Sequence, residues 1–590
     1  MSDSETRLEE LVTRIEAAAG NVPLDLLIEN VRLVNVYTGS VVETSIGVKG
    51  RRVATISSDP PKLKPLSIYS GKGMYAIPGL IDAHCHIEST LLTPAGLAAA
   101  ILPHGTTTLL IDPMEIANVA GLEGLLAFMD GMDDLPYRIF IEVSSRVPTA
   151  PGLETTGGVL GLAETERLLD HPRAVSLGEL DPAKVESLSA EHLAKILAAQ
   201  RRGKIANGHA IGLAGADLQA YAAAGLTDDH ECVTFDQLAA RVELGMKVMI
   251  REGSSERNLD ALVSGVVKHR LDTRNLMFCT DDKHPSDIRR EGHINYNVNR
   301  AIELGLDPIE AIRVATLNTA EHFRIDHLVG AIAPGRYADL LLSPSLERVE
   351  PRAVFVGGKL VSKDGELTIP ISAPEYPEKL RRTVHLFRKI SRDDFRIPAE
   401  GERRRARVIE LIPDQIVNQA GEAELAVVDG ALQPDLEGDV LPIFCVERYG
   451  MNGNIGHALI HGFGLKRGAI AGSVAHDHHN IMVVGIDSED MLTAVVALVE
   501  SQGGFVVVAD RAVRALLPLP LCGLMSEKGM DEVDAELSAV RRAAREIGCN
   551  LTAPFMTLSF VSLPTVPALG ITDYGLVDVE KHRTVPLLLK

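Results

Sequence analysis

The 590-residue chain contains no tryptophan, and only 4% of its residues are aromatic. Its core must therefore be built mainly from Leu, Val, Ile and Ala. Basic charge is also scarce, since 59 Lys and Arg oppose 80 Asp and Glu and leave a net charge of −21. This balance argues against general binding to nucleic acid or to an anionic membrane, and it favours a small-molecule partner.

Closely spaced cysteines are missing as well. The six cysteines stand far apart, at Cys85, Cys232, Cys279, Cys445, Cys522 and Cys549. No CxxC pair occurs, so neither a zinc knuckle nor a disulfide framework is predicted, and a reducing compartment suits the chain. No apolar run approaches the ~18 residues of a membrane span. We therefore expect a cytoplasmic protein without membrane contact.

The length of the chain predicts more than one domain. We expect an N-terminal surface helix, a small β module made of two separate segments, a large catalytic domain between those segments, and a third domain after a charged linker. The predicted boundaries are 1–22, then 23–75 plus 334–372, then 76–333, and finally 376–590. The size and apolar content lead us to expect a homodimer or a larger homo-oligomer.

Eight short apolar runs alternate with helical stretches inside the large domain, which is the pattern of a (β/α)8 barrel. They are YAIPGLIDAHCH, GTTTLLIDP, YRIFIEVS, AVSLGEL, KIANGHA, GLTDDHE, KVMIREG and LMFCTDD. Each run ends in polar or ionisable residues, and the active site of such a barrel lies at the carboxyl ends of its strands. The predicted fold class is thus α/β: a barrel, a small composite β-sandwich domain and an additional C-terminal α/β domain.

The strongest chemical signal is the pair His84 and His86 at the end of the first run. Side chains two apart on a strand share a face, so both imidazoles can reach one ion while Cys85 points into the packing. An HxH pair alone is weak evidence for a metal site, because two half-exposed histidines without a metal give the same sequence pattern. Further candidate ligands, however, end separate predicted strands: Glu179, His209, His230 and Asp281.

This set of imidazoles and carboxylates suits two divalent ions of manganese, iron or zinc. Two ions bridged by a carboxylate lower the pKa of a bound water toward ~7 and so create a nucleophile. Asp281, at the end of the last run, is placed to take the proton of that water and pass it to the leaving group. The plainer alternative for Asp281 is a helix N-cap, and one residue can serve both purposes.

The order of these ligands resembles the amidohydrolase superfamily. Longer stretches, among them NGHAIGLAGADLQAYAAAGLTDDHE, TDDKHPSDIRREGHINYNVNRAIELGLDP and NGNIGHALIHGFGLKRGAIAGSVAHDHHNIMVVG, look like the adenine deaminases, from about residue 25 to the C-terminus. The resemblance implies hydrolysis of adenine, a purine substrate, to hypoxanthine and ammonia at a binuclear metal centre. It also implies that His84 and His86 bind one ion with Asp281, that His209 and His230 bind the other, and that Glu179 bridges them.

Two positions bear on the choice of substrate. Cyclic amidases commonly bridge their metals with a carboxylated lysine on the fourth strand, where this chain offers Glu179, and Lys184 follows only after Pro182. Adenine deaminases typically have Asp-Pro-His-Glu after the second strand, where this chain has Met114 before Glu115. A thioether cannot replace imidazole as a ligand or proton donor. Two alternatives therefore stay open. One is a related aminohydrolase or amidase acting on another heterocycle, and the other is a catalytically silent barrel used as a binding module.

Deamination also requires a proton at a ring nitrogen. Glu115, Glu231 and Glu252 are candidates for this role because each stands at or just past a strand end, although each could equally be a solvated loop carboxylate. Arg251 is expected either to orient the substrate or to pair with a neighbouring acid. The run AHDHHN, from His476 to Asn480, is expected to reach the barrel mouth and help bind substrate, a third metal there being the less favoured alternative.

Overall fold

The computed structural model describes residues 3–59, 61–412, 417–565 and 568–590. Its centre is a ring of parallel strands, and each of the eight predicted runs contains one of them, so the predicted barrel is confirmed. The strands are β6 (Leu80–Cys85), β7 (Thr106–Ile111), β8 (Arg138–Val143), β9 (Ala174–Leu180), β10 (Ile205–Gly208), β11 (Asp228–Asp229), β12 (Lys247–Arg251) and β13 (Leu276–Cys279).

Two short junctions close the ring. Between β10 and β11, the Thr227 amide donates to the Ala206 carbonyl at 3.0 Å. Between β13 and β6, Asp281 N donates to the His84 carbonyl at 3.0 Å, and His86 N donates to the Asp281 carbonyl at 2.9 Å. The second junction ties the first and last candidate ligands into one backbone ladder, so their relative position is fixed by main-chain hydrogen bonds.

Helices cover the outside of the barrel, because the outward apolar side chains of each strand need a partner. The helices of this region are α2 (Pro94–Ile101), α3 (Met114–Asp130), α4 (Leu162–Leu169), α5 (Pro182–Glu186), α6 (Ala190–Arg201), α7 (Gly215–Ala223), α8 (Phe235–Glu243), α9 (Leu259–His269), α10 (Pro285–Glu291), α11 (Ile294–Glu303), α12 (Pro308–Val314) and α13 (Leu317–His322). Inside the ring, Leu110, Ile205, Met249 and Met277 form a separate apolar cluster. The interior is therefore packed, as this fold requires.

The small β domain joins chain segments from both sides of the barrel. Its strands are β1 (Leu26–Asn35), β2 (Ser40–Lys49), β3 (Arg52–Ser57), β4 (Ser67–Ser70), β5 (Tyr75–Pro78), β14 (Leu340–Ser343), β15 (Ala353–Val356), β16 (Lys359–Lys363) and β17 (Glu366–Leu367). β5 pairs with β14 in antiparallel fashion, and β3 bonds to residues 335–338, so the two segments form one curled sheet. Helix α1 (Asp3–Ala19) packs beside it.

After α14 (Glu378–Arg381), the C-terminal part forms a nine-stranded sheet in the order β20-β19-β18-β22-β21-β24-β23-β25-β26. The strands are β18 (Arg403–Leu411), β19 (Asn418–Val428), β20 (Ala431–Leu432), β21 (Val440–Val446), β22 (Ile455–His461), β23 (Ala469–Gly472), β24 (Ile481–Gly485), β25 (Gly504–Ala509) and β26 (Ala512–Pro518), and a smaller sheet holds β27 (Leu569–Thr572), β28 (Gly575–Asp578) and β29 (Arg583–Thr584). Only β18 and β22 pair in parallel; the other neighbours in the large sheet are antiparallel. Helices α15 (Ser488–Glu500), α16 (Met530–Glu546) and α17 (Pro554–Phe560) pack on it.

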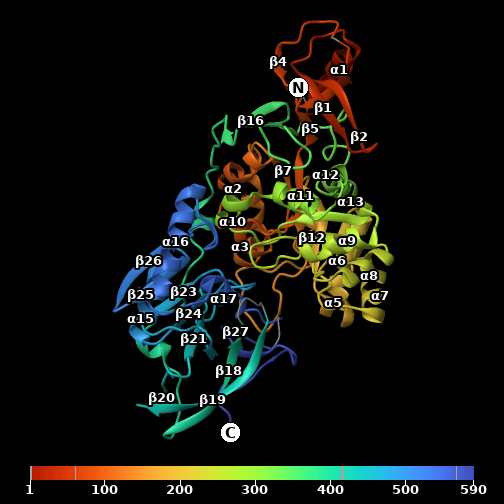
Figure 1. The fold of residues 1–590 in the computed structure, drawn as a ribbon. Coiled ribbons are helices and arrows are strands. Elements are labelled where there is room, and N and C mark those ends of the chain that lie inside the picture. Colours follow the sequence, from red (N-terminus) through yellow and green to blue (C-terminus); the bar gives the residue numbers. More distant parts are fainter. Residues whose placement is uncertain (1–2, 60, 413–416, 566–567) are drawn as a thin grey trace.

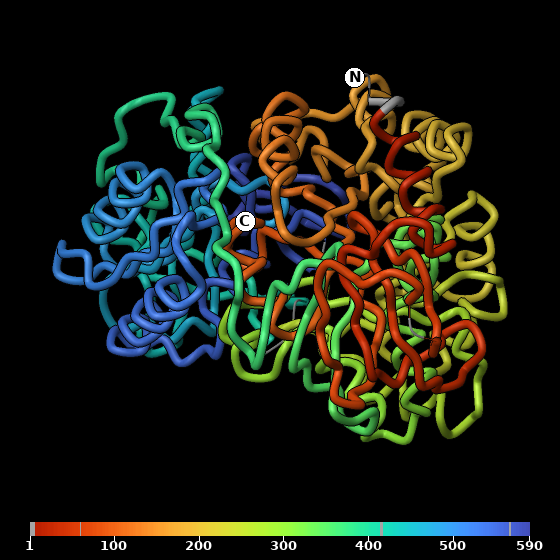
Figure 2. The backbone as a smooth tube through the Cα atoms, turned by 90° about the horizontal axis from the view of Figure 1, so that it is seen from above, coloured from red at the N-terminus to blue at the C-terminus, as the bar shows by residue number. Residues whose placement is uncertain are grey.

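The red N-terminal strands stand at one end of the barrel, and the teal-to-blue C-terminal part stands beside it (Figure 1). In the view from above, the red strands overlie the barrel and the C-terminal part lies to one side of it (Figure 2). Hydrogen bonds join the C-terminal part to the barrel, for example from Thr155 Oγ1 to Asp573 at 2.6 Å. Among the described residues, no helix has both the length and the apolar character to cross a membrane.

Candidate active site

A cavity of about 120 Å³ opens at the carboxyl ends of the barrel strands. All but one of the predicted metal ligands line it; the exception, His84, is 1% exposed, and its ring contacts that of His86 edge to face, with centroids 5.1 Å apart. The C-terminal part closes one side of the cavity with His476, Asp477, Phe560, Leu563 and Thr565. The site is therefore built from two parts of the chain that lie far apart in sequence.

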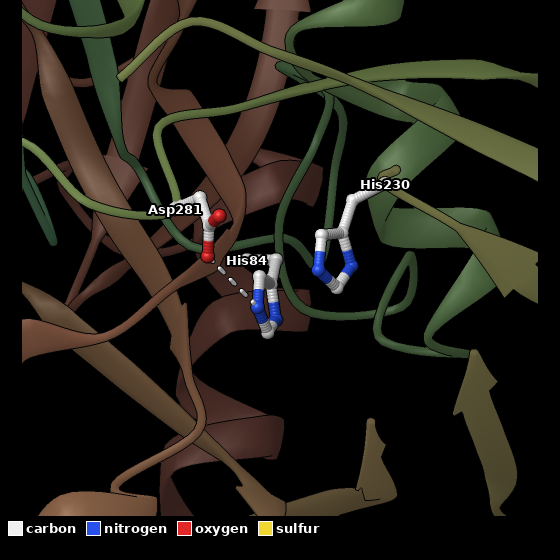
Figure 3. A group of neighbouring side chains, drawn as sticks. All are labelled: His84, His230 and Asp281. Carbon is white, nitrogen blue, oxygen red and sulfur yellow. Dashed lines mark ion pairs between the residues drawn. The ribbon is translucent and has the colours of Figure 1, made fainter. Parts of the chain in front are cut away.

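The first group of candidate ligands surrounds the β6–β13 junction. His84 Nε2 and His86 Nε2 lie 3.4 and 3.5 Å from the same oxygen, Asp281 Oδ1. His84 also stacks on His230, with ring centroids 4.5 Å apart, and Figure 3 shows these two rings beside the Asp281 carboxylate. As predicted, Cys85 turns away into the packing between strands and helices.

The second group centres on Glu179. His209 Nδ1 and His230 Nε2 each lie 3.1 Å from Glu179 Oε2, and 3.3 Å from each other. On the other side, His84 Nε2 is 3.9 Å from Oε2 and His86 Nε2 is 4.0 Å from Oε1. Glu179 thus faces both pairs of histidines, which is the position that a bridging carboxylate needs.

The donor set fits divalent metal ions. His84 Nε2 and Asp281 Oδ1 are buried and face each other, yet neither has a hydrogen-bond partner among the described residues. Unsatisfied buried polar atoms are costly, so their convergence indicates ligand atoms. Burial opposes charge on His86, but Glu179 and Asp281 outweigh it and raise the pKa of His86 to about 10. The site therefore stabilises positive charge, which bound cations would supply.

Neighbouring groups orient the ligands. Glu142 Oε2 lies 2.6 Å from His84 Nδ1, so the other ring nitrogen, Nε2, is left to act as the ligand atom. The Asp112 carbonyl fixes His86 Nδ1 in the same way, at 3.0 Å. Gly178 permits the close approach of Asp112 to β9, because a Cβ atom there would meet Asp112 Oδ2 at 2.2 Å.

We expect Glu142→Gln to lower metal affinity by about 10- to 100-fold, since partners of metal-binding histidines usually have effects of this size. Glutamine removes the negative charge beside His84 while it keeps the shape of the side chain. Metal content after dialysis against graded chelator would measure the change. The exposed Glu123→Gln serves as the matched control. Equal chelator resistance in both variants would contradict the orienting role.

Arg251 pairs with two acids at once. Its Nη1 atom lies 2.7 Å from Glu231 Oε1 and 2.7 Å from Asp281 Oδ2. Burial opposes ionisation of Glu231, but Arg251 and then His209 outweigh it and lower the pKa of the Glu231 carboxyl. Burial likewise opposes ionisation of Asp281, yet its contact with His84 and the charge of Arg251 hold its pKa well below the ordinary range. Both carboxyls are thereby kept ionised.

The three candidate proton donors, Glu115, Glu231 and Glu252, lie in different surroundings. Glu115 lines the cavity and is 1% exposed. Glu231 lines it too, but as an ionised partner of Arg251. Glu252 is not among the lining side chains; its carboxylate accepts from the Leu259 amide at 3.2 Å and from Arg257 at 3.3 Å. Glu252 follows Arg251, the last residue of β12, and adjacent residues along an extended chain point to opposite faces, which agrees with Arg251 lining the cavity and Glu252 lying outside it.

The histidines of the C-terminal run behave differently from one another. His476 Nδ1 lies 3.1 Å from Glu115 Oε1, and His479 Nε2 lies 3.9 Å from Glu115 Oε2. The three residues could hold a cation. However, the Ala475 amide donates to His479 Nδ1 at 3.2 Å, which puts the imidazole hydrogen on Nε2 and makes that atom a donor toward Glu115. His478 is fully buried outside the cavity.

Three charged residues of the site carried no clear signal in the sequence. Arg146 donates to Glu179 Oε1, and its Nη1 atom lies 3.8 Å from Asp477 Oδ2. Glu142 supports His84, as described above. Glu142 and Arg146 both belong to the stretch IEVSSR at the end of β8. The charged residues at this strand end were the one feature of the sequence that could have indicated site residues there. Asp477 stood within the run that was expected to reach the barrel mouth.

The barrel, with its histidine and carboxylate centre, defines a metal-dependent hydrolase of the amidohydrolase class. Residues 75–361 match the model of the amidohydrolase family, and residues 415–583 match that of the adenine deaminase C-terminal domain. An adenine deaminase from Desulforamulus reducens is 50% identical over 580 residues, which are 98% of each chain. The chain therefore belongs to the adenine deaminase family.

Other relatives agree in length. An adenine deaminase from Methanothrix thermoacetophila is 42% identical over 585 residues, covering 99% of this chain and all of that one. One from Desulfatibacillum aliphaticivorans is 42% identical over 575 residues, covering 97% and 99%. Among solved structures, an L-hydantoinase from Arthrobacter aurescens aligns over 59% of this chain and 98% of its own, with 16% identity and a TM-score of 0.44.

Proposed function

We propose that this chain hydrolyses adenine to hypoxanthine and ammonia at the centre formed by the two histidine pairs, Glu179 and Asp281. The observation that carries the proposal is the convergence of both pairs on two carboxylates inside one cavity. Such a centre suits attack of water on the ring carbon that bears the amino group. Family membership over nearly the whole chain supports adenine as the substrate.

His84, His86 and Asp281 would hold one divalent ion, and His209 and His230 would hold a second, with Glu179 between them. Bound manganese, iron or zinc supplies Lewis acidity that lowers the pKa of a water toward ~7. Imidazole and carboxylate accept all three metals. Two ions per chain and a role in purine salvage are part of the same proposal.

Asp281 has the geometry of a proton acceptor. Its Oδ2 atom accepts from Arg251 at 2.7 Å, while Oδ1 faces the histidines. Because Arg251 helps keep the carboxylate ionised, Asp281 can take a proton from the attacking water and pass it to the leaving ammonia. Arg251 then has the task of fixing the orientation of Asp281 and Glu231 rather than binding the substrate directly.

The ring nitrogen needs a different proton source. Glu115 is the best placed of the candidate carboxyls, because it lies in the cavity without a neighbouring arginine ion pair among the described residues. His476, 3.1 Å from Glu115, is held as a cation: burial opposes its charge, but Glu115 raises its pKa to about 9. The pair can deliver a proton to a bound base. Glu252, turned away from the cavity, has no such role.

The deciding experiment is ammonia release from adenine by purified protein, stripped of metal and then reconstituted with manganese, iron or zinc. Metal-dependent release of ammonia and hypoxanthine is the expected result. No ammonia release with any metal, in protein that binds the metals, would overturn adenine as the substrate. Another heterocycle would then have to be sought among aminopurines, pyrimidines and cyclic amides.

Met114 stands in the cavity wall at the position where resemblance leads us to expect histidine. We expect Met114→His to change kcat/KM for adenine by less than about tenfold, because Met114 offers only an apolar contact and the proton transfers fall to other residues. Steady-state kinetics with adenine would measure this. A large gain in kcat/KM would show that the natural substrate lies elsewhere.

Two further predictions belong to this proposal. The enzyme is expected to work in a reducing cytoplasm, which agrees with six unpaired, buried cysteines. A homodimer or larger homo-oligomer is expected, and analytical ultracentrifugation of the full chain would test it.

A further inference from the structure

The loop between β23 and β24 brings a carboxylate of the C-terminal part, Asp477, to the cavity wall. Thr149 Oγ1 donates to Asp477 Oδ2 at 2.7 Å, and Arg146 Nη1 lies 3.8 Å from the same oxygen. Arg146 Nη2 in turn donates to Glu179. A single guanidinium group therefore spans the distance between Asp477 and the carboxylate at the centre of the proposed metal site.

The backbone beside Asp477 is anchored at two points to the segment that contains α17. His476 N donates to Ser559 Oγ at 3.2 Å, and Ser562 Oγ donates to the His476 carbonyl at 2.8 Å. The Asp477 side chain itself is only 6% exposed. It is thus a fixed, buried carboxylate and not a flexible surface acid.

One oxygen of this carboxylate is left over. Thr149 donates a hydrogen bond to Oδ2, and Arg146 lies nearest to the same oxygen. No described group makes a hydrogen bond to Oδ1. His476 Nδ1, at 3.8 Å, is beyond hydrogen-bond distance from it. Asp477 is one of the cavity-lining residues, and its Oδ1 atom is free to accept a hydrogen bond from a ligand in the cavity that brings an N–H group.

We propose that Asp477 Oδ1 accepts a hydrogen bond from the azole N–H of the free purine base and thereby makes the enzyme reject purines substituted at that nitrogen. The proposal rests on the proposed function and specifies its substrate class as the nucleobase. A nucleoside carries a sugar in place of this hydrogen, so it would lose the hydrogen bond and press a bulky group against a buried carboxylate. Sites built around a substrate N–H discriminate strongly against analogues that lack it.

The cavity wall next to Asp477 supports a flat ligand. Phe560 and Leu563 line the cavity from the same part of the chain, and Met114 lines it from α3. These apolar side chains suit the faces of a purine ring, whereas the carboxylates suit its edge. Recognition at the edge distant from the reacting carbon would also place that carbon near Glu179.

The test compares adenine with 9-methyladenine in the metal-loaded wild type, in Asp477→Ala and in a control, Asp573→Ala. Asp573 is also a buried acid of the C-terminal part and also accepts from a barrel threonine, Thr155, at 2.6 Å. We expect the wild type to prefer adenine by about 10³-fold or more in kcat/KM. Asp477→Ala should lose roughly 10- to 100-fold with adenine and almost nothing with 9-methyladenine, so the preference falls by that factor. The control should keep the preference.

An equal loss with both substrates in Asp477→Ala would overturn the proposal, since it would mean that Asp477 acts only through Arg146. Dissociation constants for hypoxanthine and 9-methylhypoxanthine, measured by calorimetry, give a readout independent of turnover. If the wild type turned over neither substrate, the proposed function would fail. The preference for hypoxanthine over 9-methylhypoxanthine in binding would still test the role of Asp477. Should Asp477→Ala not fold, the isosteric Asp477→Asn is expected to lower the preference about tenfold, because a neutral acceptor makes the weaker hydrogen bond.

Discussion

Asp281→Asn is expected to lower the rate of ammonia release from adenine by roughly 10²- to 10⁴-fold, the usual contribution of a general acid or base. An amide cannot accept and return a proton at neutral pH. The backbone tolerates this substitution because Asp281 has a φ of 57°, in the left-handed region that asparagine adopts readily. The backbone bonds that join β13 to β6 through this residue are therefore expected to survive. Bound metal is measured in the same samples, because Asp281 is also a proposed ligand beside His84 and His86.

The melting temperature of the variant should stay close to that of the wild type, which would separate lost chemistry from lost fold. Asp260→Asn, the same change at an exposed helix position, should leave turnover unaltered and should lower stability only slightly, by about 1 kcal/mol or less, because it weakens an exposed ion pair with Arg300. Full turnover in Asp281→Asn would show that the proton-transfer role belongs to another group.

Glu179→Gln is expected to reduce both bound metal and turnover, the latter by more than about 100-fold. Loss of a group that merely supports a ligand costs 10- to 100-fold in affinity or activity, so loss of a carboxylate that faces both histidine pairs should cost more. The change also removes the charge partner of the buried Arg146. Elemental analysis of the protein after gel filtration, together with ammonia release, would measure the two effects.

The exposed Glu186→Gln on α5, a few residues along the chain, is the matched control and should retain metal and activity. If Glu179→Gln kept the metal content of the wild type and its turnover, the bridging position would be wrong. A variant that kept its metal but lost turnover would instead show that Glu179 acts in the chemical step and is not needed to hold the metal.

Much of the candidate metal centre could be predicted from the chain alone. His84, His86, Glu179, His209 and Asp281 each stand at the end of an apolar run, and parallel strands of a barrel bring such ends together. The alternation of strand side chains also predicted that Cys85 would leave the site. The same alternation explains why Glu252, next to Arg251, does not line the cavity.

The contribution of the C-terminal part could be anticipated only in outline. The run from His476 to Asn480 was expected near the barrel mouth, but its five polar side chains, all buried, do not share one environment. His476 and Asp477 line the cavity, His478 is buried elsewhere, and His479 is fixed as a donor by the Ala475 amide. Such differences depend on loop backbone geometry, for which a sequence of consecutive polar residues carries no periodic signal.

The sequence by itself predicted the barrel and the residues proposed as metal ligands, because strand periodicity and strand ends are local properties of the chain. The adenine deaminase family was indicated by the resemblance of longer stretches, and the comparisons show it. Only the tertiary structure decided which charges meet across the cavity: Arg146 between Glu179 and Asp477, Glu142 behind His84, and Arg251 between Glu231 and Asp281. These pairs join residues 20 to more than 300 positions apart. Their contacts arise from how the barrel closes and how the C-terminal part packs on it, which no local pattern specifies.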